Sequence, residues 1–421
     1  MGRILHSISH FFCNLSQKKI ISYSILILVV SVSFLFSPEP KSKKDYCGIY
    51  IKLSSHIGFT FNCDAGEFCT NARTPFKVLE DSAARQSRPL FILIASLIGH
   101  PLQWVTEQLN LPLFQSMEPN PTMYVGYYIT YIIINFITLL FSLLLFDLIA
   151  IYFSGGNISN WMLFTFQLLL TSNEITKTFF WTAHQQFFSM FTPLLTIWLS
   201  IVIIQKKYTL ADISGFSLLC GILMLMYGNF PPMFFCLLLI AFLTDKQIRV
   251  LHLVKNIGLF LLPTLIWMGI CIYKIGRYYN HEVEIHRQLI WIADALQVSN
   301  VAFHVQLLKN IYLYAFTFKE ILIFISIAIC AFIYMKMKVK LTGDKEKTRE
   351  LIIITAIAYF LFFMLLGFYM ERLTYTLFPI CLCAMLFSIC QSKQLQKYTG
   401  IYIVLSIIWH LYTLLSYGPF T

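Results

Sequence analysis

The chain has 421 residues, of which 58% are hydrophobic and only 12% are charged, and its mean hydropathy is +0.70. Soluble domains carry about 25% charged residues, so this composition excludes a soluble globular protein and predicts a chain surrounded by lipid. The formal net charge of +11 does not indicate nucleic-acid binding, because the basic residues fall in short loops between apolar runs, which is the positive-inside pattern.

The first membrane span is predicted at residues 20–37, directly after the basic pair Lys18 and Lys19. Residues 38–41 (Pro-Glu-Pro-Lys) lack the small side chains of a signal-peptidase site, so we expect this run to remain as a span. Residues 1–19 then form a cytoplasmic N-terminus.

A long, mostly polar segment, residues 38–121, follows the first span and contains Cys47, Cys63 and Cys69. On the oxidising side of a membrane these thiols are expected to form a disulfide. The spacing leaves the pairing open between Cys63 with Cys69 and Cys47 with either of them.

Two acidic residues of this segment, Asp64 and Glu67, are candidates for chemistry. A carboxylate at the membrane surface can accept a proton from a sugar hydroxyl, or it can bind a divalent cation such as Mg²⁺ or Mn²⁺. The structural alternative is that Asp64 caps a helix, with Glu67 three residues further on.

Two arginines, Arg85 and Arg88, precede an apolar stretch that begins Pro-Leu-Phe. A guanidinium group forms paired hydrogen bonds to phosphate, so these residues are candidate ligands for a phosphate or a lipid headgroup. The structural alternative is a helical ion pair between Asp81 and Arg85, together with general attraction to anionic lipid.

Residues 88–105 are apolar only over a short stretch, which His100 and Pro101 interrupt. If this segment crossed the membrane, the densest basic loop of the chain, residues 334–350, would lie outside. The positive-inside rule therefore favours an interfacial or re-entrant helix at 88–105, and it places both 38–121 and the loop 276–309 on the outer side.

The remaining part of the chain, residues 122–421, is predicted to form a transmembrane helical domain of about ten spans. The predicted spans are 123–150, 158–173, 183–204, 213–227, 230–244, 256–275, 310–333, 351–369, 373–391 and 399–417. With the first span they give an all-α polytopic membrane protein of about eleven transmembrane helices, with a large outer loop that contains interfacial helices.

Further polar residues on the predicted outer side are candidates for lining a cavity. They are Glu174, His184 and Gln185 near the mouth of the fourth span, His286 and Arg287 in the loop 276–309, and Glu371 beside Arg372 in a short turn. Arg372 can also reach an anionic substrate. The alternatives are an interfacial belt, an amphipathic surface helix and a charge pair that contacts only itself or lipid headgroups.

These motifs together resemble those of the GT-C class of integral-membrane glycosyltransferases, in the branch of the protein mannosyltransferases and the aminoarabinose transferases. Residues 64–68 (Asp-Ala-Gly-Glu-Phe) are similar to an acidic Asp-Glu-x-x-Tyr motif of that branch, and residues 87–90 (Ser-Arg-Pro-Leu) to its Lys-Pro-Pro-Leu motif. Arg372 and Pro379 match a late arginine followed by a proline. The chain departs from the pattern at Ala65, at Phe68 and in having one proline in the second motif.

The resemblance implies an enzyme that transfers a hexose or pentose, with inversion, from a polyprenyl-phosphate carrier to a glycan, lipid or protein acceptor. Asp64 would be the general base, and Arg85, Arg88 and Arg372 would bind the carrier phosphate; metal dependence stays open. The implied location is the bacterial inner membrane, with the chemistry on the outer side. The rival classes are a transporter or flippase of lipid-linked glycan and an O-antigen polymerase or ligase.

Overall fold

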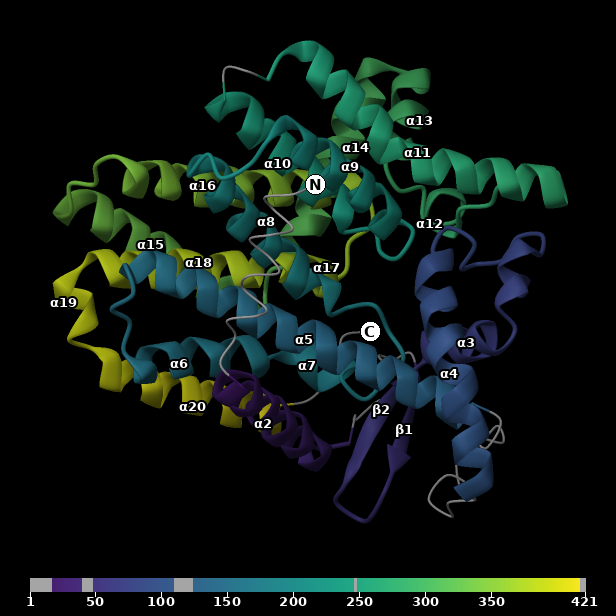
Figure 1. Cartoon of the computed structure of the whole chain (residues 1–421), viewed down its shortest axis with the longest axis horizontal. Coiled ribbons are helices and arrows are strands. Elements are labelled where there is room, and N and C mark those ends of the chain that lie inside the picture. Colours follow the sequence, from purple (N-terminus) through teal and green to yellow (C-terminus); the bar gives the residue numbers. More distant parts are fainter. Residues whose placement is uncertain (1–16, 40–47, 110–123, 246–247, 417–421) are drawn as a thin grey trace.

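The computed structural model of the chain is almost entirely helical, and it describes residues 17–39, 48–109, 124–245 and 248–416 (Figure 1). The N-terminal part consists of helix α2 (Gln17–Ser33), the short helix η1 (Phe34–Phe36), strands β1 (Gly48–Lys52) and β2 (Gly58–Asn62), helix α3 (Cys63–Arg73), η3 (Pro75–Leu79) and α4 (Pro89–Leu109). The two strands pair antiparallel, with Gly48 opposite Asn62 and Lys52 opposite Gly58.

The rest of the chain is helical throughout its described residues. Its first half contains α5 (Val125–Ser154), α6 (Asn160–Thr171), α7 (Glu174–Phe179), α8 (Phe188–Ile204), α9 (Leu210–Met224), α10 (Phe230–Thr244) and α11 (Val250–Ile275). Its second half contains α12 (His281–Glu284), α13 (Ile290–Val298), α14 (Asn300–Phe316), α15 (Leu322–Lys338), α16 (Asp344–Leu366), α17 (Glu371–Thr374), η6 (Tyr375–Leu377), α18 (Phe378–Gln391), α19 (Lys393–Gln396) and α20 (Thr399–Leu415).

Six helices within the described ranges are long and apolar enough to cross a membrane: α2 with η1, α4, α5, α11, α16 and the continuous unit from α17 to α18. The predicted class, an all-α multi-pass membrane protein, is therefore confirmed. The predicted count of eleven spans is not confirmed, because several predicted spans, such as those at α9 and α10, form helices of only 15 residues.

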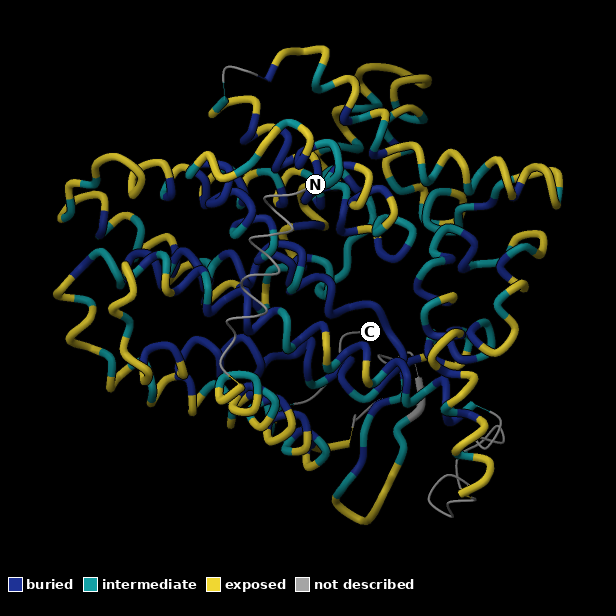
Figure 2. The backbone as a smooth tube through the Cα atoms, viewed as in Figure 1, coloured by how far each residue is buried: buried dark blue, intermediate teal, exposed yellow. Residues whose placement is uncertain are grey.

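The burial pattern agrees with contact between this protein and a lipid bilayer. In Figure 2 the buried backbone lies in the middle of the molecule, along α5, α8 and α18, and the exposed backbone lies at the periphery. The exposed side chains of the peripheral helices α2, α11 and α20 include Ile25, Val254, Leu265 and Ile408. Large apolar side chains exposed in this number indicate lipid rather than water as the surrounding medium.

One predicted span, 310–333, is wrong as a single helix. Helix α14 ends at Phe316 and α15 begins at Leu322, because a turn that contains Lys319 and Glu320 separates them. The Thr374 hydroxyl donates to the carbonyl of Thr317 at 2.8 Å, which ties this turn to α17.

The predicted interruption at Pro101 is also absent, because α4 continues through this residue for 21 residues in all. Figure 1 shows α4 lying across the N-terminal end of α5 rather than along that helix. This arrangement suits the interfacial helix predicted for 88–105, although the length of α4 would also allow it to cross the membrane. The part of the outer segment at 110–121 lies outside the described residues, as do residues 1–16.

The close approach of α4 and α5 depends on Gly126, and we expect Gly126→Ala to destabilise the protein. A Cβ at this position would overlap the backbone nitrogen and Cα of Gln103, whose side chain accepts a hydrogen bond from the Gly126 N–H at 2.8 Å. Forcing the two helices apart costs about 1–3 kcal/mol, which a lower melting temperature of the detergent-solubilised protein would report. Gly269→Ala is the matched control, because no atom lies within 4 Å of its added Cβ. A Gly126→Ala melting temperature no lower than that of Gly269→Ala would contradict this account.

Asp147 pairs with a lysine of the first helix. It is buried on α5 and forms an ion pair of 2.7 Å with Lys19 on α2. A buried carboxylate requires such a partner, so this pair fixes the first helix against the centre of the domain.

The cysteines of the outer segment differ in state. Cys63 is disulfide-bonded, whereas Cys69 is a free thiol buried on the inner face of α3. The predicted pairings that use Cys69 are therefore wrong, because this side chain packs as a small apolar group instead. Cys47 lies outside the described residues.

Candidate active site

The start of α3 positions the first acidic candidate. The side chain of Asn62 accepts a hydrogen bond from the Asp64 N–H at 2.9 Å, so Asn62 rather than Asp64 is the N-cap. Asp64 therefore lies in the first turn of the helix, where the helix dipole favours a negative charge and its carboxylate is free to point away from the backbone.

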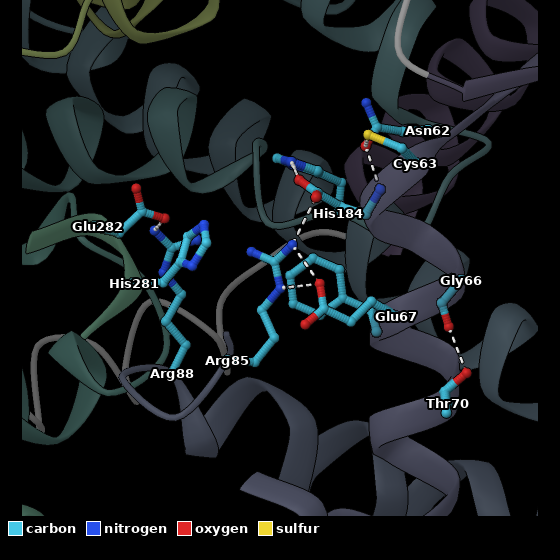
Figure 3. A network of polar contacts seen from close by, with 12 residues as sticks. Asn62, Cys63, Gly66, Glu67, Thr70, Arg85, Arg88, His184, His281 and Glu282 are labelled. Atoms are coloured by element: carbon cyan, nitrogen blue, oxygen red, sulfur yellow. Dashed lines mark hydrogen bonds and ion pairs between the residues drawn. The ribbon is translucent and has the colours of Figure 1, made fainter. Parts of the chain in front are cut away.

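Arg85 is buried against this turn and contacts both acidic candidates (Figure 3). One Nη lies 2.6 Å from Asp64 and 3.0 Å from Glu67, and the guanidinium stacks over the ring of Phe68 at 4.6 Å. The alternative pairing of Asp81 with Arg85 is wrong, since Asp81 pairs with Arg277 at 2.5 Å. Arg85 thus bridges the two carboxylates and offsets one of their two negative charges.

This arrangement does not fit the Mg²⁺ or Mn²⁺ site that the sequence left open. Arg85 bridges Asp64 and Glu67, so their oxygens already face a cation of the chain itself. Nowhere in the described part of the chain do three or more His, Cys, Asp or Glu side chains gather closely enough to hold a metal ion. We derive no chemical step through a metal.

His184, in the turn before α8, stands between Asp64 and Arg372. Its Nε2 lies 3.5 Å from the Asp64 carboxylate and 3.3 Å from the Arg372 guanidinium. Burial lowers the pKa of His184 to about 4, and the neighbouring carboxylate only partly opposes this, so the imidazole is neutral at pH 7. Its Nδ1 is buried and has no hydrogen-bond partner among the described residues.

The charge of Asp64 is stabilised by its surroundings. Burial opposes ionisation, but the contact with His184 and the charges of Arg85 and Arg372 outweigh it and hold the pKa of the carboxyl well below its usual range. Asp64 is therefore an anion at every physiological pH.

The guanidinium of Arg372, on the short helix α17, lies beside His184 in the same site. Its backbone carbonyl accepts from the Gln186 amide at 2.9 Å, and the Tyr227 hydroxyl donates to the other end of that amide at 3.4 Å. Among the described residues its guanidinium has no carboxylate within ion-pair distance, and it contacts His184 instead. A partly buried guanidinium without a paired acid is suited to an anionic ligand.

Stretches far apart in the sequence therefore meet in one polar cavity of about 90 Å³. Its charged lining residues are Asp64, Arg85, Arg88, Glu282 and Arg372, and its other polar lining residues are His184, Gln186, Tyr227, Asn229 and Gln288. Arg88 is held at 2.6 Å by Glu282, which comes from the loop between α11 and α13. Three arginines and two carboxylates line the cavity, and Glu67 also pairs with Arg85, so Arg372 is the lining arginine whose charge is available to an anion.

The other predicted cavity residues lie outside this lining. Glu371 pairs with Lys319 at 2.6 Å, and Arg287 pairs with Asp294 at 2.5 Å on the surface. His286 packs on the ring of Phe368, which itself faces the cavity. Gln185 is buried, and neither end of its amide has a hydrogen-bond partner among the described residues.

Glu174 is buried at the start of α7, where it accepts a hydrogen bond from Ser416 at 3.1 Å. Lys177, three residues later, donates to the carbonyls of Thr413 and Ser416 at the end of α20. These two residues fasten the C-terminal helix and do not face the cavity.

Glu282 was not predicted to face the site. Residues 282–294 have the charge spacing of an amphipathic surface helix, yet Glu282 turns inward to Arg88. Gln186, which lies in the same polar stretch as His184 and Gln185 at the mouth of the fourth predicted span, does line the cavity. Tyr227 was missed as a wall residue, because only the packing of distant helices brings it to the cavity.

Comparison of the chain with protein-family models, with curated proteins and with solved structures finds no match.

The buried Glu174 gives the stability a defined pH dependence. Burial raises the pKa of Glu174 to about 7 from a usual 4.5, with Lys177 and Ser416 partly opposing the shift. The folded chain then binds more protons than the unfolded chain between these values, so this group's stabilising contribution falls as the pH rises through them. His184 contributes in the opposite sense below its usual pKa of 6.5. We expect Glu174→Gln to remove the first effect alone, which amounts to up to about 3 kcal/mol.

Melting temperatures at pH 5 and pH 8 measure this. Relative to wild type, Glu174→Gln gains stability at pH 8 compared with pH 5, whereas Glu284→Gln, an exposed acid, shows no such change. An equal difference between wild type and Glu174→Gln at both pH values would contradict the assignment.

Proposed function

We propose that this chain is a membrane glycosyltransferase of the GT-C type. It transfers a sugar, with inversion, from a polyprenyl-phosphate carrier to a glycan, lipid or protein acceptor on the outer side of the membrane. The observation that carries the proposal is that Asp64, Arg88 and Arg372, which come from three separate motifs, line one cavity. The proposal includes eleven spans, a cytoplasmic N-terminus and the bacterial inner membrane.

A second cavity supports a lipid-linked donor. It measures about 700 Å³ and is lined almost wholly by apolar side chains. Its walls come from α14, α15, α16, η6 and α18, and they include Tyr314, Phe318, Phe332, Phe360 and Leu377. The exposed apolar side chains along it would face lipid tails.

The two cavities share a wall. Phe360 and Met364 of α16 line the apolar cavity, whereas Phe363 and Leu366 of the same helix line the polar one. On the next two short helices, Arg372 of α17 lines the polar cavity and Leu377 of η6 lines the apolar one. An isoprenoid chain in the apolar cavity would therefore have its phosphate near Arg372.

The chemistry follows from the charges. The bond between the sugar C1 and the carrier phosphate oxygen breaks, a bond from C1 to the acceptor oxygen forms, and the electron pair stays on the phosphate. Arg372 and Arg88 stabilise the charge that builds on this leaving group. Asp64 accepts a hydrogen bond from the acceptor hydroxyl, takes its proton as the new bond forms and stabilises positive charge at C1.

The low pKa of Asp64 sets its role more closely. The carboxylate is ionised in the resting site, so it is in the form that can orient the acceptor hydroxyl, accept its proton and stabilise positive charge at C1. The Nε2 of the neutral His184 contacts both Asp64 and Arg372, so this ring holds the two charged groups in position.

A strain deleted for the gene and complemented with the wild-type chain tests the proposal. Loss of a surface glycan modification, with accumulation of the glycosylated carrier lipid on the outer leaflet, is the expected result of deletion. Accumulation on the inner leaflet would instead indicate a flippase, and single glycan units in place of chains would indicate a polymerase.

A further inference from the structure

The segment 276–289 covers the polar cavity and is fastened to the chain before α4. Arg277 pairs with Asp81, and the Tyr279 N–H donates to the Gln86 side chain at 2.6 Å. The tightest link to the site itself is the Arg88–Glu282 pair at 2.6 Å, in which each side chain is about 20% exposed.

Both oxygens of the Glu282 carboxylate are engaged. Oε1 accepts from Arg88, and Oε2 accepts from the Gln288 amide at 3.0 Å. The oxygen Oε1 of Glu282 therefore lies where a phosphate oxygen would have to lie to bind Arg88, and it supplies the same kind of anionic acceptor.

The space that remains is too small for a glycosyl phosphate. The polar cavity measures about 90 Å³, whereas pockets that hold ligands of this size measure roughly 300–1,000 Å³. The apolar cavity already has about 700 Å³. The apolar cavity thus has room for a lipid tail, whereas the polar cavity has no room for the glycosyl phosphate head group.

The ends of the segment have the backbone of a hinge. Gly276 has a φ of 81°, and Arg287 and Leu289 have φ values of 51° and 62°, which side chains larger than glycine rarely adopt. The last of these is held by the Leu289 N–H, which donates to the carbonyl of Leu366 at 2.9 Å. Strain of this kind persists only while the surrounding contacts hold it.

We propose that segment 276–289 is a lid and that Glu282 is a built-in anion that occupies Arg88 until the phosphate of the donor displaces it. The lid gives the site selectivity, because a ligand must carry enough negative charge to replace a carboxylate that already has two partners. The identity of the donor rests on the proposed function, whereas the lid itself does not.

Two measurements on the purified full-length protein test this, with Glu282→Gln against Glu284→Gln. Both variants lose one acid from α12, but Glu284 is exposed and does not line the cavity. We expect Glu282→Gln to bind geranylgeranyl phosphate roughly tenfold more tightly than wild type, and its Tyr279 amide to exchange hydrogen faster without ligand. Glu284→Gln changes neither.

The outcomes separate the two proposals. Unchanged exchange at 276–289 in Glu282→Gln, or unchanged or weaker binding of geranylgeranyl phosphate where wild type binds it, overturns the lid. Faster exchange with no binding of geranylgeranyl phosphate or inorganic phosphate by any variant supports the lid and overturns the proposed donor. A gain in affinity for inorganic phosphate alone keeps the lid and assigns it to a free phosphate.

Discussion

Asp64→Asn is expected to lower sugar transfer by about 10²–10⁴-fold while the chain still folds. The amide has the shape of the carboxylate, and Arg85 keeps its contact with Glu67 at 3.0 Å. We therefore expect the local packing to be unchanged. What disappears is the negative charge beside the acceptor hydroxyl and the group that accepts its proton. Surface glycan in a deletion strain that carries the variant is the measurement.

Glu67→Gln is the matched control for this prediction. Glu67 shares Arg85 with Asp64, but it is more exposed and does not line the cavity. Transfer by Glu67→Gln should stay close to wild type. Wild-type glycan in the Asp64→Asn strain, with equal protein in the membrane, would remove Asp64 from the catalytic role.

The class of the protein could be predicted from the sequence because lipid imposes a strong compositional requirement. Apolar runs such as the predicted spans 123–150 and 351–369 have one solution in a bilayer, and each falls largely within a single long helix, α5 and α16. The break between α14 and α15 at 317–321 was missed because the prediction of spans rested on hydropathy. Lys319 and Glu320 sit between two apolar runs, and hydropathy alone does not separate two packed helices from one span with a charged centre.

The site could be predicted only in part. The positive-inside rule predicted Asp64, Arg88 and Arg372 on the same side of the membrane, and all three line one cavity. The sequence could not show that Arg85 would form ion pairs with Asp64 and Glu67, or that Glu282 would form an ion pair with Arg88. Which carboxylate each arginine contacts depends on the three-dimensional fold. The sequence did not show which of the three arginines would have a paired acid.

Arg372→Ala is expected to lower transfer by roughly 10²–10³-fold, mainly through kcat. Arg372 is the cavity guanidinium with no carboxylate at ion-pair distance among the described residues, whereas Arg85 and Arg88 are each paired within 2.6 Å. Its charge is therefore available for the leaving phosphate without first breaking an internal pair. A charge that builds in the transition state is stabilised more than the bound donor, and for this reason kcat responds more than KM.

Arg372→Lys separates charge from geometry. The ammonium keeps the charge but loses the planar pair of donors, so transfer should recover only partly. Arg349→Ala, which removes an arginine paired with Glu346 outside the cavity, should leave transfer unchanged. If Arg372→Ala raised KM alone, the arginine would bind donor and transition state equally. Equal transfer by Arg372→Ala and wild type would leave Arg88 as the cation for the leaving group, and Glu282 would then have to move in every turnover.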